Sequence, residues 1–329
     1  MKQGAEPPER VLRVKELPVG EFVGEYLEKN QPVIVTNAMQ TWRALTTWNP
    51  SKFAKEFGSE RVQIYGDLFK LTAIDSLSNY FEKYFDRNDH PQRHTAAGSV
   101  PYVRWYCHLS ADDRVPWADK VFDQLSADWA RPSFFPPHGF ALPICSPTDS
   151  IDPSRDWFPA RGLFISARGA RTRLHADPWC SDAILCQIYG KKDFVMYHPS
   201  QSVLLSEGGR TVDVEAPDLQ AFPDFSRAQV AVQDTLEPGE CLLVPAGWHH
   251  HFKSATNSIS LTWNFVHLSR LEPYLAYLSR GPQNSEIKQL AYAYFESPGR
   301  RPLNQADFIA SLAAARVQSN GRSETTPTR

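Results

Sequence analysis

The chain has 329 residues, of which 42% are hydrophobic and 22% charged, a balance typical of globular proteins. A formal net charge of −2 and a pI near 6.6 favour neither nucleic acid nor an anionic membrane as a partner. The five cysteines are scattered, without the spacing of a disulfide framework or a zinc ribbon. Since the N-terminus lacks an apolar signal segment and no long apolar run follows, we expect a protein of the reducing cytoplasm.

Helical and strand patterns alternate after an N-terminal extension over residues 1–18. In chain order, the pattern predicts an amphipathic helix (19–30), a short buried strand (31–39), a helix that stops at Gly58 and is followed by a strand (48–66), loops with short helices (84–160) and one strand-like run within them (100–109). This first part of the chain therefore mixes α and β elements.

From Gly162 onward the chain consists of short apolar or alternating runs separated by turn dipeptides. The runs are residues 162–167, 172–178, 183–190, 192–199, 211–216, 240–247, 249–255 and 258–266. About eight short strands in succession predict an all-β sandwich or barrel. After Arg270, residues 270–316 return to helical patterns, and residues 317–329 form a polar tail that we expect to be disordered.

One of these predicted strands carries two candidate metal ligands. His175 and Asp177 are two residues apart, so on a strand they point to the same face. Two histidines and one carboxylate on one side of a metal form the non-haem Fe(II) arrangement. The alternative is a structural histidine followed by a turn residue before Pro178. A histidine cluster on a second strand, about seventy residues further on, favours the metal site.

The cluster consists of His249, His250 and His251. Strand alternation places His250 on one face and the other two histidines on the opposite face. Either His250 alone or the flanking pair therefore points into the barrel, and the spacing by itself leaves this choice open.

Three stretches resemble one family of proteins. Residues 172–199 ("TRLHADPWCSDAILCQIYGKKDFVMYHP") and 237–266 ("EPGECLLVPAGWHHHFKSATNSISLTWNFV") look like the JmjC/cupin-like Fe(II)- and 2-oxoglutarate-dependent oxygenases, and residues 26–48 resemble the lead-in of their small hydroxylase members. The resemblance spans roughly residues 20–270. It implies a mainly β fold with flanking α-helices: a double-stranded β-helix (jelly-roll) barrel over residues 161–267.

The resemblance also implies domain limits and metal ligands. It places the catalytic domain over residues 19–269, followed by the C-terminal helical region. In this family the last ligand is the histidine five residues after the proline of a P-x-x-W-x-H motif, which here is His250. The implied Fe(II) ligands are His175, Asp177 and His250, while His249 and His251 face away from the metal.

A 2-oxoglutarate site is expected in the same barrel. Lys192 shares a strand face with Phe194 and Met196, so it is predicted to be buried and to need an anionic partner. The alternative is a lysine whose ammonium reaches the surface. The resemblance favours Lys192 as the carboxylate anchor and adds Thr172 as a hydroxyl donor.

Tyr102 resembles the tyrosine with which the hydroxylase members of the family contact 2-oxoglutarate, although Tyr106, four residues later, is an alternative. Residues 258–264 alternate polar and apolar side chains, which suits a strand with one face towards a cavity or towards water. Asn264, in the polar row, matches a family asparagine near the co-substrate. Leu185 departs from the family, since some relatives have an asparagine there.

The resemblance implies an enzyme that uses Fe(II), 2-oxoglutarate and O2 and releases succinate and CO2. Hydroxylation of a protein or peptide side chain is the first hypothesis, followed by small-molecule hydroxylation, N-methyl-lysine demethylation and non-catalytic cupin-like binding. Trp179 and Trp248 are candidate substrate contacts. The C-terminal helices either form a homodimer or pack on the barrel, and the sequence does not choose between the two.

Overall fold

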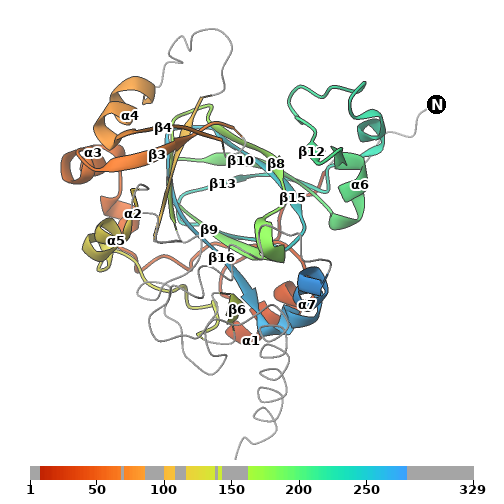
Figure 1. Ribbon diagram of the computed structural model, residues 1–329. Coiled ribbons are helices and arrows are strands. Elements are labelled where there is room, and N and C mark those ends of the chain that lie inside the picture. The colour runs from red at the N-terminus through yellow and green to blue at the C-terminus, as the bar shows by residue number, and fades with distance from the viewer. Residues whose placement is uncertain are drawn as a thin grey trace, which may run out of the picture.

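The protein folds around a barrel made of two facing sheets (Figure 1). This computed structural model describes residues 8–67, 70–85, 100–107, 116–137, 140–142 and 162–279. Strands dominate the part from residue 162 onward, and helices lie around the barrel, as the sequence predicted. The mainly β jelly-roll fold with flanking helices is confirmed.

The larger sheet has ten strands among the described residues, in the order β1-β2-β14-β9-β16-β7-β5-β3-β4, with β6 paired to β16. Their bounds are β1 Arg13–Val14, β2 Val33–Val35, β3 Arg61–Tyr65, β4 Leu71–Ser76, β5 Tyr102–Tyr106, β6 Phe140–Leu142, β7 Gly162–Ser166, β9 Asp182–Tyr189, β14 Cys241–Val244 and β16 Ser258–His267. Because β16 lies between β9 and β7 near the middle of this sheet, one of its faces lines the barrel.

The smaller sheet faces the larger one and is antiparallel, with the order β13-β10-β15-β8. Its strands are β8 Arg171–His175, β10 Lys192–Tyr197, β13 Val232–Leu236 and β15 His249–Ser254. A separate hairpin of β11 (Ser206–Glu207) and β12 (Arg210–Thr211) lies outside the barrel, beside β8 and β15 (Figure 1). Both histidines proposed as metal ligands lie in the smaller sheet.

Short helices surround the barrel. They are α1 Val19–Glu21, the π-helix η1 Phe22–Leu27, α2 Ala44–Thr47, α3 Pro50–Phe57, α4 Leu77–Tyr84, α5 Asp119–Leu125, α6 Ser202–Leu205 and α7 Leu271–Ser279, with 3-10 turns η2 Pro178–Cys180, η3 Pro199–Gln201, η4 Pro223–Arg227 and η5 Leu268–Arg270. Helices α2 to α5 lie on the side of β3 and β4, and α1 and α7 lie near the end of β16 (Figure 1). Within the described ranges, every helix is too short or too polar to cross a bilayer.

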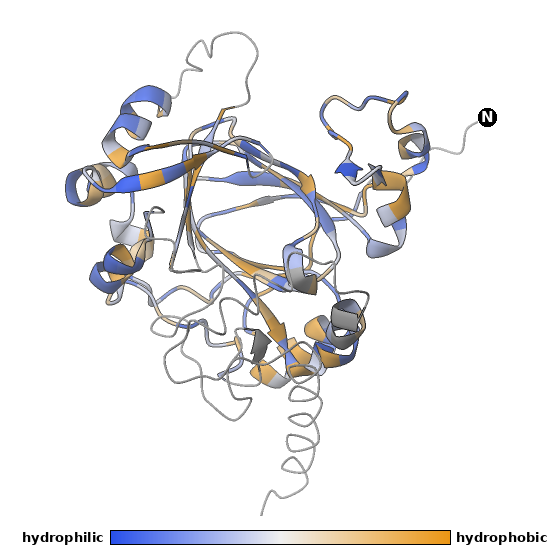
Figure 2. Cartoon of the chain, viewed as in Figure 1, coloured by the Kyte–Doolittle hydropathy of each residue, from blue (hydrophilic) through white to orange (hydrophobic). Residues whose placement is uncertain are grey.

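Most of the apolar core lies between the larger sheet and these helices. Ile259, Leu261, Trp263 and Phe265 of β16 belong to that cluster, while the alternate residues of β16 face the barrel interior. The predicted polar row is therefore directed into a cavity and not into bulk water. In Figure 2, α4 is hydrophilic on its outer side, whereas the end of β16 and the neighbouring α1 are hydrophobic.

Two predicted elements differ from the structure. The helix expected over residues 19–30 continues beyond α1 as a π-helix and ends at Leu27. The strand expected over residues 211–216 is wrong beyond Thr211, because Val212 and Val214 pack in a local cluster with Leu205 and not in a sheet. The predicted helices beyond residue 279 lie outside the described residues.

Candidate metal centre

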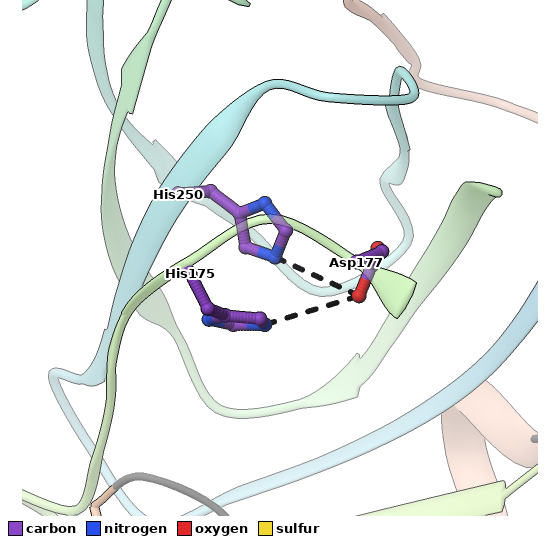
Figure 3. A group of neighbouring side chains, drawn as sticks. All are labelled: His175, Asp177 and His250. Atoms are coloured by element: carbon purple, nitrogen blue, oxygen red, sulfur yellow. Dashed lines mark ion pairs between the residues drawn. The ribbon is translucent and has the colours of Figure 1, made fainter. Parts of the chain in front are cut away.

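Three side chains with metal-binding atoms converge at one end of the barrel (Figure 3). Nε2 of His175 lies 3.8 Å and Nε2 of His250 lies 4.0 Å from Oδ1 of Asp177. One ligand atom from each residue falls within 4.8 Å of the others, and this is the one such group of three among the described residues. The structure thus brings together the three residues that the sequence proposed.

Neighbouring strands place these side chains. His250 of β15 is directly opposite His175 at the end of β8, and Asp177 follows just before the turn η2. A β-bulge in β8 changes the register, so that Phe252 is opposite Thr172. The extra residue brings Thr172 and His175 to the same side of the sheet, although three positions separate them.

The hydrogen bonds of the two imidazoles prepare them to bind a metal. Nδ1 of His175 donates to the carbonyl oxygen of Arg173 at 2.8 Å, and Nδ1 of His250 donates to that of Trp248 at 2.9 Å. Since a carbonyl oxygen only accepts, each Nδ1 carries the proton and each Nε2 presents its lone pair towards Asp177.

Electrostatics favour the neutral form of His175. Burial lowers the pKa of His175 well below its usual value, which keeps the imidazole neutral. Burial raises the pKa of Asp177, while the charges of His250 and Arg104 and a hydrogen bond from Asn264 oppose that rise. Two neutral imidazole nitrogens and one carboxylate oxygen fit the donor set that Fe(II) accepts.

A cavity of about 1240 Å³ adjoins the three residues. Lys192, only 5% exposed, lies in its wall and donates from Nζ to Oγ of Ser260 at 2.7 Å. Burial lowers the pKa of this ammonium to about 7. Thr172 and Thr262 line the same cavity, and so does Leu185, where the sequence departs from some relatives. Lys192 is therefore buried, as predicted.

Asn264 lies beside the carboxyl group of Asp177. Its Nδ2 donates to Oγ of Ser181 at 3.1 Å, and its amide also hydrogen-bonds Asp177. Ser181 and Asp177 flank the turn η2, so Asn264 holds both sides of that turn. This position suits the orientation of the carboxylate, in addition to the predicted contact with 2-oxoglutarate.

The two candidate tyrosines share one face of β5. Tyr106 lines the cavity, and its phenol accepts a hydrogen bond from Nε of Arg104 at 2.8 Å. Tyr102 is fully buried, and its ring is stacked on Phe164 at 6.1 Å between centroids. Arg104 also lines the cavity but escaped the sequence reasoning. Its position midway between two inward-facing tyrosines on one strand was a signal that could have identified it.

Trp248 does not fit the predicted role of substrate contact. Its side chain is 4% exposed, its Nε1 donates to the carbonyl oxygen of Asn30 at 2.9 Å, and it is absent from the described lining of the cavity. Trp248 precedes β15, next to Gly247 with a φ of +78°, so the strand alternation does not extend to it. The side chain of Trp179, the other candidate, lies outside the described residues.

The two remaining histidines of the cluster lie in different surroundings. His251 is buried on the outer face of the smaller sheet, with Nε2 3.6 Å from Oε1 of Glu215. His249, expected to face away in the same manner, is instead among the residues that line the cavity. It begins β15 directly after the turn at Gly247, where the alternation is weakest.

Comparisons with known proteins agree with this geometry. A family model described as a cupin-like domain matches residues 19–270. The arginine-specific demethylase JMJ20 of Arabidopsis thaliana is 27% identical over 280 residues, which cover 78% of this chain and 57% of the relative. The tRNA wybutosine-synthesizing protein 5 of Danio rerio is 27% identical over 295 residues, which cover 83% and 81%. The 2-oxoglutarate and iron-dependent oxygenase JMJD4 of Gallus gallus is 23% identical over 264 residues, which cover 77% and 59%. The chain thus spans less than two thirds of the length of two of these relatives.

Proposed function

The chain belongs to the family of cupin-like domains, and on this basis we propose that it is an Fe(II)- and 2-oxoglutarate-dependent oxygenase that hydroxylates a protein or peptide side chain. One observation carries the proposal: the three metal-binding side chains and the buried ammonium of Lys192 lie in the same cavity. A metal and a dicarboxylate are the two ligands that such an arrangement suits.

Different residues would bind the metal and the co-substrate. His175, Asp177 and His250 would hold Fe(II) from one side and leave its other positions open. With 2-oxoglutarate and O2, the bound metal supplies the oxidising chemistry that hydroxylates a C–H bond and releases succinate and CO2. Lys192 would pair with the distal carboxylate of 2-oxoglutarate, with Thr172 and Tyr102 or Tyr106 as hydroxyl donors.

Hydroxylation is favoured over demethylation by the charge of the cavity. A methylammonium group is a cation, and although the described lining has aromatic rings that suit such a group, its four Lys and Arg side chains oppose a cationic substrate. Among the described lining residues, Asp177 is the only carboxylate, and the proposal gives it to the metal. Small-molecule hydroxylation is the second candidate, since the same cavity would admit a metabolite. A non-catalytic binding role is disfavoured because the three ligands and Lys192 are all in place.

We also propose that the protein acts in the cytoplasm. Among the described residues, the buried cysteines Cys186 and Cys241 are both thiols. Their sulfur atoms are 3.4 Å apart and hydrogen-bonded as thiols, without a disulfide bond between them. A reducing compartment favours this state.

The test is succinate formation with Fe(II), 2-oxoglutarate and ascorbate against a panel of peptides and metabolites. The product of the best substrate is then analysed by mass spectrometry. A gain of one oxygen on a peptide supports the proposal. Loss of a methyl group with release of formaldehyde would make the protein a demethylase, and oxidation of metabolites alone would assign it a small-molecule substrate.

A further inference from the structure

One glutamine in the wall of the cavity has a buried polar group that the fold does not pair. Gln63 of β3 is only 4% exposed, and it is among the residues that line the cavity beside the metal centre. Its Oε1 is buried and has no hydrogen-bond partner among the described residues. A buried amide oxygen without a partner destabilises the folded protein, so its presence calls for an explanation.

The pattern of β3 directs this side chain into the cavity. Val62 and Ile64 belong to the apolar core on the outer face of the sheet. By strand alternation, Gln63 and Tyr65 point inwards, and both line the cavity. An apolar residue at position 63 would fill the same space and leave no polar atom unpaired. A ligand therefore explains the glutamine better than folding does.

The register of the larger sheet separates Gln63 from the proposed anchor of 2-oxoglutarate. Ser260, which binds Lys192, lies opposite Phe164 of β7. The pairing of β7 with β5, and of β5 with β3, continues this row to Gln63. Three strand spacings separate the two ends of the row, so Gln63 lies roughly 14 Å from Ser260 along the sheet. A co-substrate held between Lys192 and the metal therefore leaves Gln63 to the primary substrate.

A carboxamide is neutral and can both donate and accept hydrogen bonds. Its nitrogen donates and its oxygen accepts, so a ligand pairs fully with it only by offering an acceptor and a donor side by side. The amide group of a peptide offers this combination. Gln63 is therefore suited to bind an amide.

A charged substrate group suits the same position less well. The described lining of the cavity has four Lys and Arg side chains, which oppose a cation. A carboxylate could accept from the nitrogen of Gln63, but it offers no donor to the oxygen and leaves that atom unpaired. A neutral amide avoids both penalties.

We propose that Gln63 binds an amide of the primary substrate, either a backbone amide or a side-chain carboxamide of a peptide, and so holds the substrate in the cavity beside the metal. This inference rests on the proposed function, because it assigns Lys192 to 2-oxoglutarate and the oxidising chemistry to the metal. The unpaired amide lowers the stability of the free protein, and substrate binding restores the missing hydrogen bonds.

A peptide fits this site better than RNA, although the edge of a nucleobase also combines a donor with an acceptor. The chain has a formal net charge of −2. Glu207 and Asp218 are exposed on the segment whose hairpin β11–β12 lines the cavity. Carboxylates there would repel the phosphates of RNA, whereas an uncharged peptide amide is not affected.

The experiment compares two neutral probes of similar shape: 4-fluorobenzamide, which has a donor and an acceptor, and 4-fluoroacetophenone, which has an acceptor alone. Their binding is measured by ¹⁹F NMR with N-oxalylglycine, an inert analogue of 2-oxoglutarate, at saturation. Mn(II) at the metal centre should broaden the signal of a probe bound in the same cavity. Capped pentapeptides with a central Gln or Met, labelled with 4-fluorophenylalanine, form a second arm that separates a side-chain carboxamide from a backbone amide.

We expect the benzamide to bind at least about tenfold more tightly than the acetophenone, because only the benzamide pairs with both atoms of the carboxamide. Gln63→Met, which keeps the size of the side chain, should remove this preference and leave the affinity for N-oxalylglycine unchanged. Without ligand, the same variant should keep or raise the midpoint of thermal unfolding, because it removes an unpaired polar group. Gln220→Met, at an exposed position outside the described cavity lining, is the matched control and should change none of these quantities.

Equal binding of the two probes overturns the inference, as does a preference that survives in Gln63→Met. A large fall in the unfolding midpoint of Gln63→Met would show that the carboxamide supports the fold instead. A parallel loss of N-oxalylglycine binding would assign Gln63 to the co-substrate. Adenosine that displaces the benzamide at lower concentration than either peptide would assign the site to a nucleobase. Failure to bind Mn(II) refutes the proposed function separately, since the preference between the probes is still measured from spectra without the metal.

Discussion

At the scale of single residues, the three adjacent histidines are expected to differ sharply. His250→Ala removes one of three metal-binding atoms, so the affinity for Mn(II) or Fe(II) should fall at least about 100-fold. His251→Ala should keep that affinity, because its ring lies on the outer face near Glu215. Isothermal titration with Mn(II), together with succinate formation, measures the effect. A folded His251 variant without metal binding, beside a functional His250 variant, would contradict the geometry.

Lys192 and Lys191 form a matched pair for the co-substrate. Lys192→Ala should weaken the binding of 2-oxoglutarate by about 3–5 kcal/mol, because removal of one partner leaves a buried carboxylate unpaired. Lys191 is half-exposed, and its Nζ lies 3.0 Å from Oε1 of Glu237, so Lys191→Ala should have little effect. The measurement is the dissociation constant of 2-oxoglutarate in each variant. Equal losses in the two would show that Lys192 is not the anchor.

Lys192 should also make co-substrate binding dependent on pH. Burial lowers its pKa to about 7 in the free protein, whereas a bound carboxylate favours the charged form. Binding then takes up a proton above pH 7, and the affinity for 2-oxoglutarate should fall by roughly tenfold per pH unit there. Below pH 6 the ammonium is already charged and the affinity should level off. Binding curves from pH 5.5 to 9 test this, and Lys192→Arg should flatten the profile.

The residues of the site were predictable where one strand or one motif relates them. The spacing of His175 and Asp177 was sufficient for a candidate pair, and the choice of His250 came from the resemblance. Alternation alone could not place Thr172 on the same side as His175, because a β-bulge intervenes and leaves no local mark in the sequence. Arg104 was missed because its role depends on residues brought from β3 and β7.

At the scale of elements, the turn between β9 and β10 controls where Lys192 lies. Gly190 has a φ of +69°, and a Cβ there would lie 1.8 Å from the carbonyl oxygen of Asn257. Gly190→Ala should lower the free energy of unfolding by more than about 2 kcal/mol, since strain and a backbone clash combine. Gly208→Ala is the control: φ is +56° but the space is open, so the loss should be about 1 kcal/mol. Urea denaturation measures both, and equal losses would show that the clash is relieved.

Elements were predictable when their own side chains face the main core. The strands of the barrel with continuous or alternating apolar residues, such as β9 and β14, were recovered from the pattern. Strand β13 was missed because it carries Asp234, whose burial is explained by the distant Arg13 at 2.7 Å. The opposite error, a predicted strand that does not form, occurs at residues 211–216. The alternating valines there pack in a local cluster of loop residues and not in a sheet.

At the scale of the whole molecule, the two faces of the larger sheet have different roles. Its inner face carries polar residues such as Ser260, which binds Lys192, and its outer face packs against the N-terminal helices. Through Ser260 and Asn264, strand β16 contacts Lys192 and Asp177 on its inner face, and its outer face packs against the helical layer. The site and the helical layer therefore cannot unfold independently without exposing the largest apolar cluster of the described residues. We expect a single cooperative transition for both.

Trp263 tests this coupling, because it lies on the outer face of β16. It is fully buried, with ring centroids 5.5 Å from Phe135 and 6.2 Å from Trp129. Trp263→Ala should lower the free energy of unfolding by about 3–5 kcal/mol through the cavity it creates. Trp263→Phe should cost much less, since it keeps an aromatic ring and removes a buried N–H that has no hydrogen-bond partner among the described residues.

The Ala variant should also lose affinity for 2-oxoglutarate as it melts, because Ser260, which binds Lys192, and Asn264, which lines the cavity, lie on the opposite face of the same strand. Thermal unfolding followed by circular dichroism and by retention of bound 2-oxoglutarate gives the two curves. Coincident midpoints, both lowered in Trp263→Ala, would show that the helical layer stabilises the site through the sheet. A binding curve that stays at the wild-type midpoint while the helices melt early would show that the barrel is stable without its outer layer.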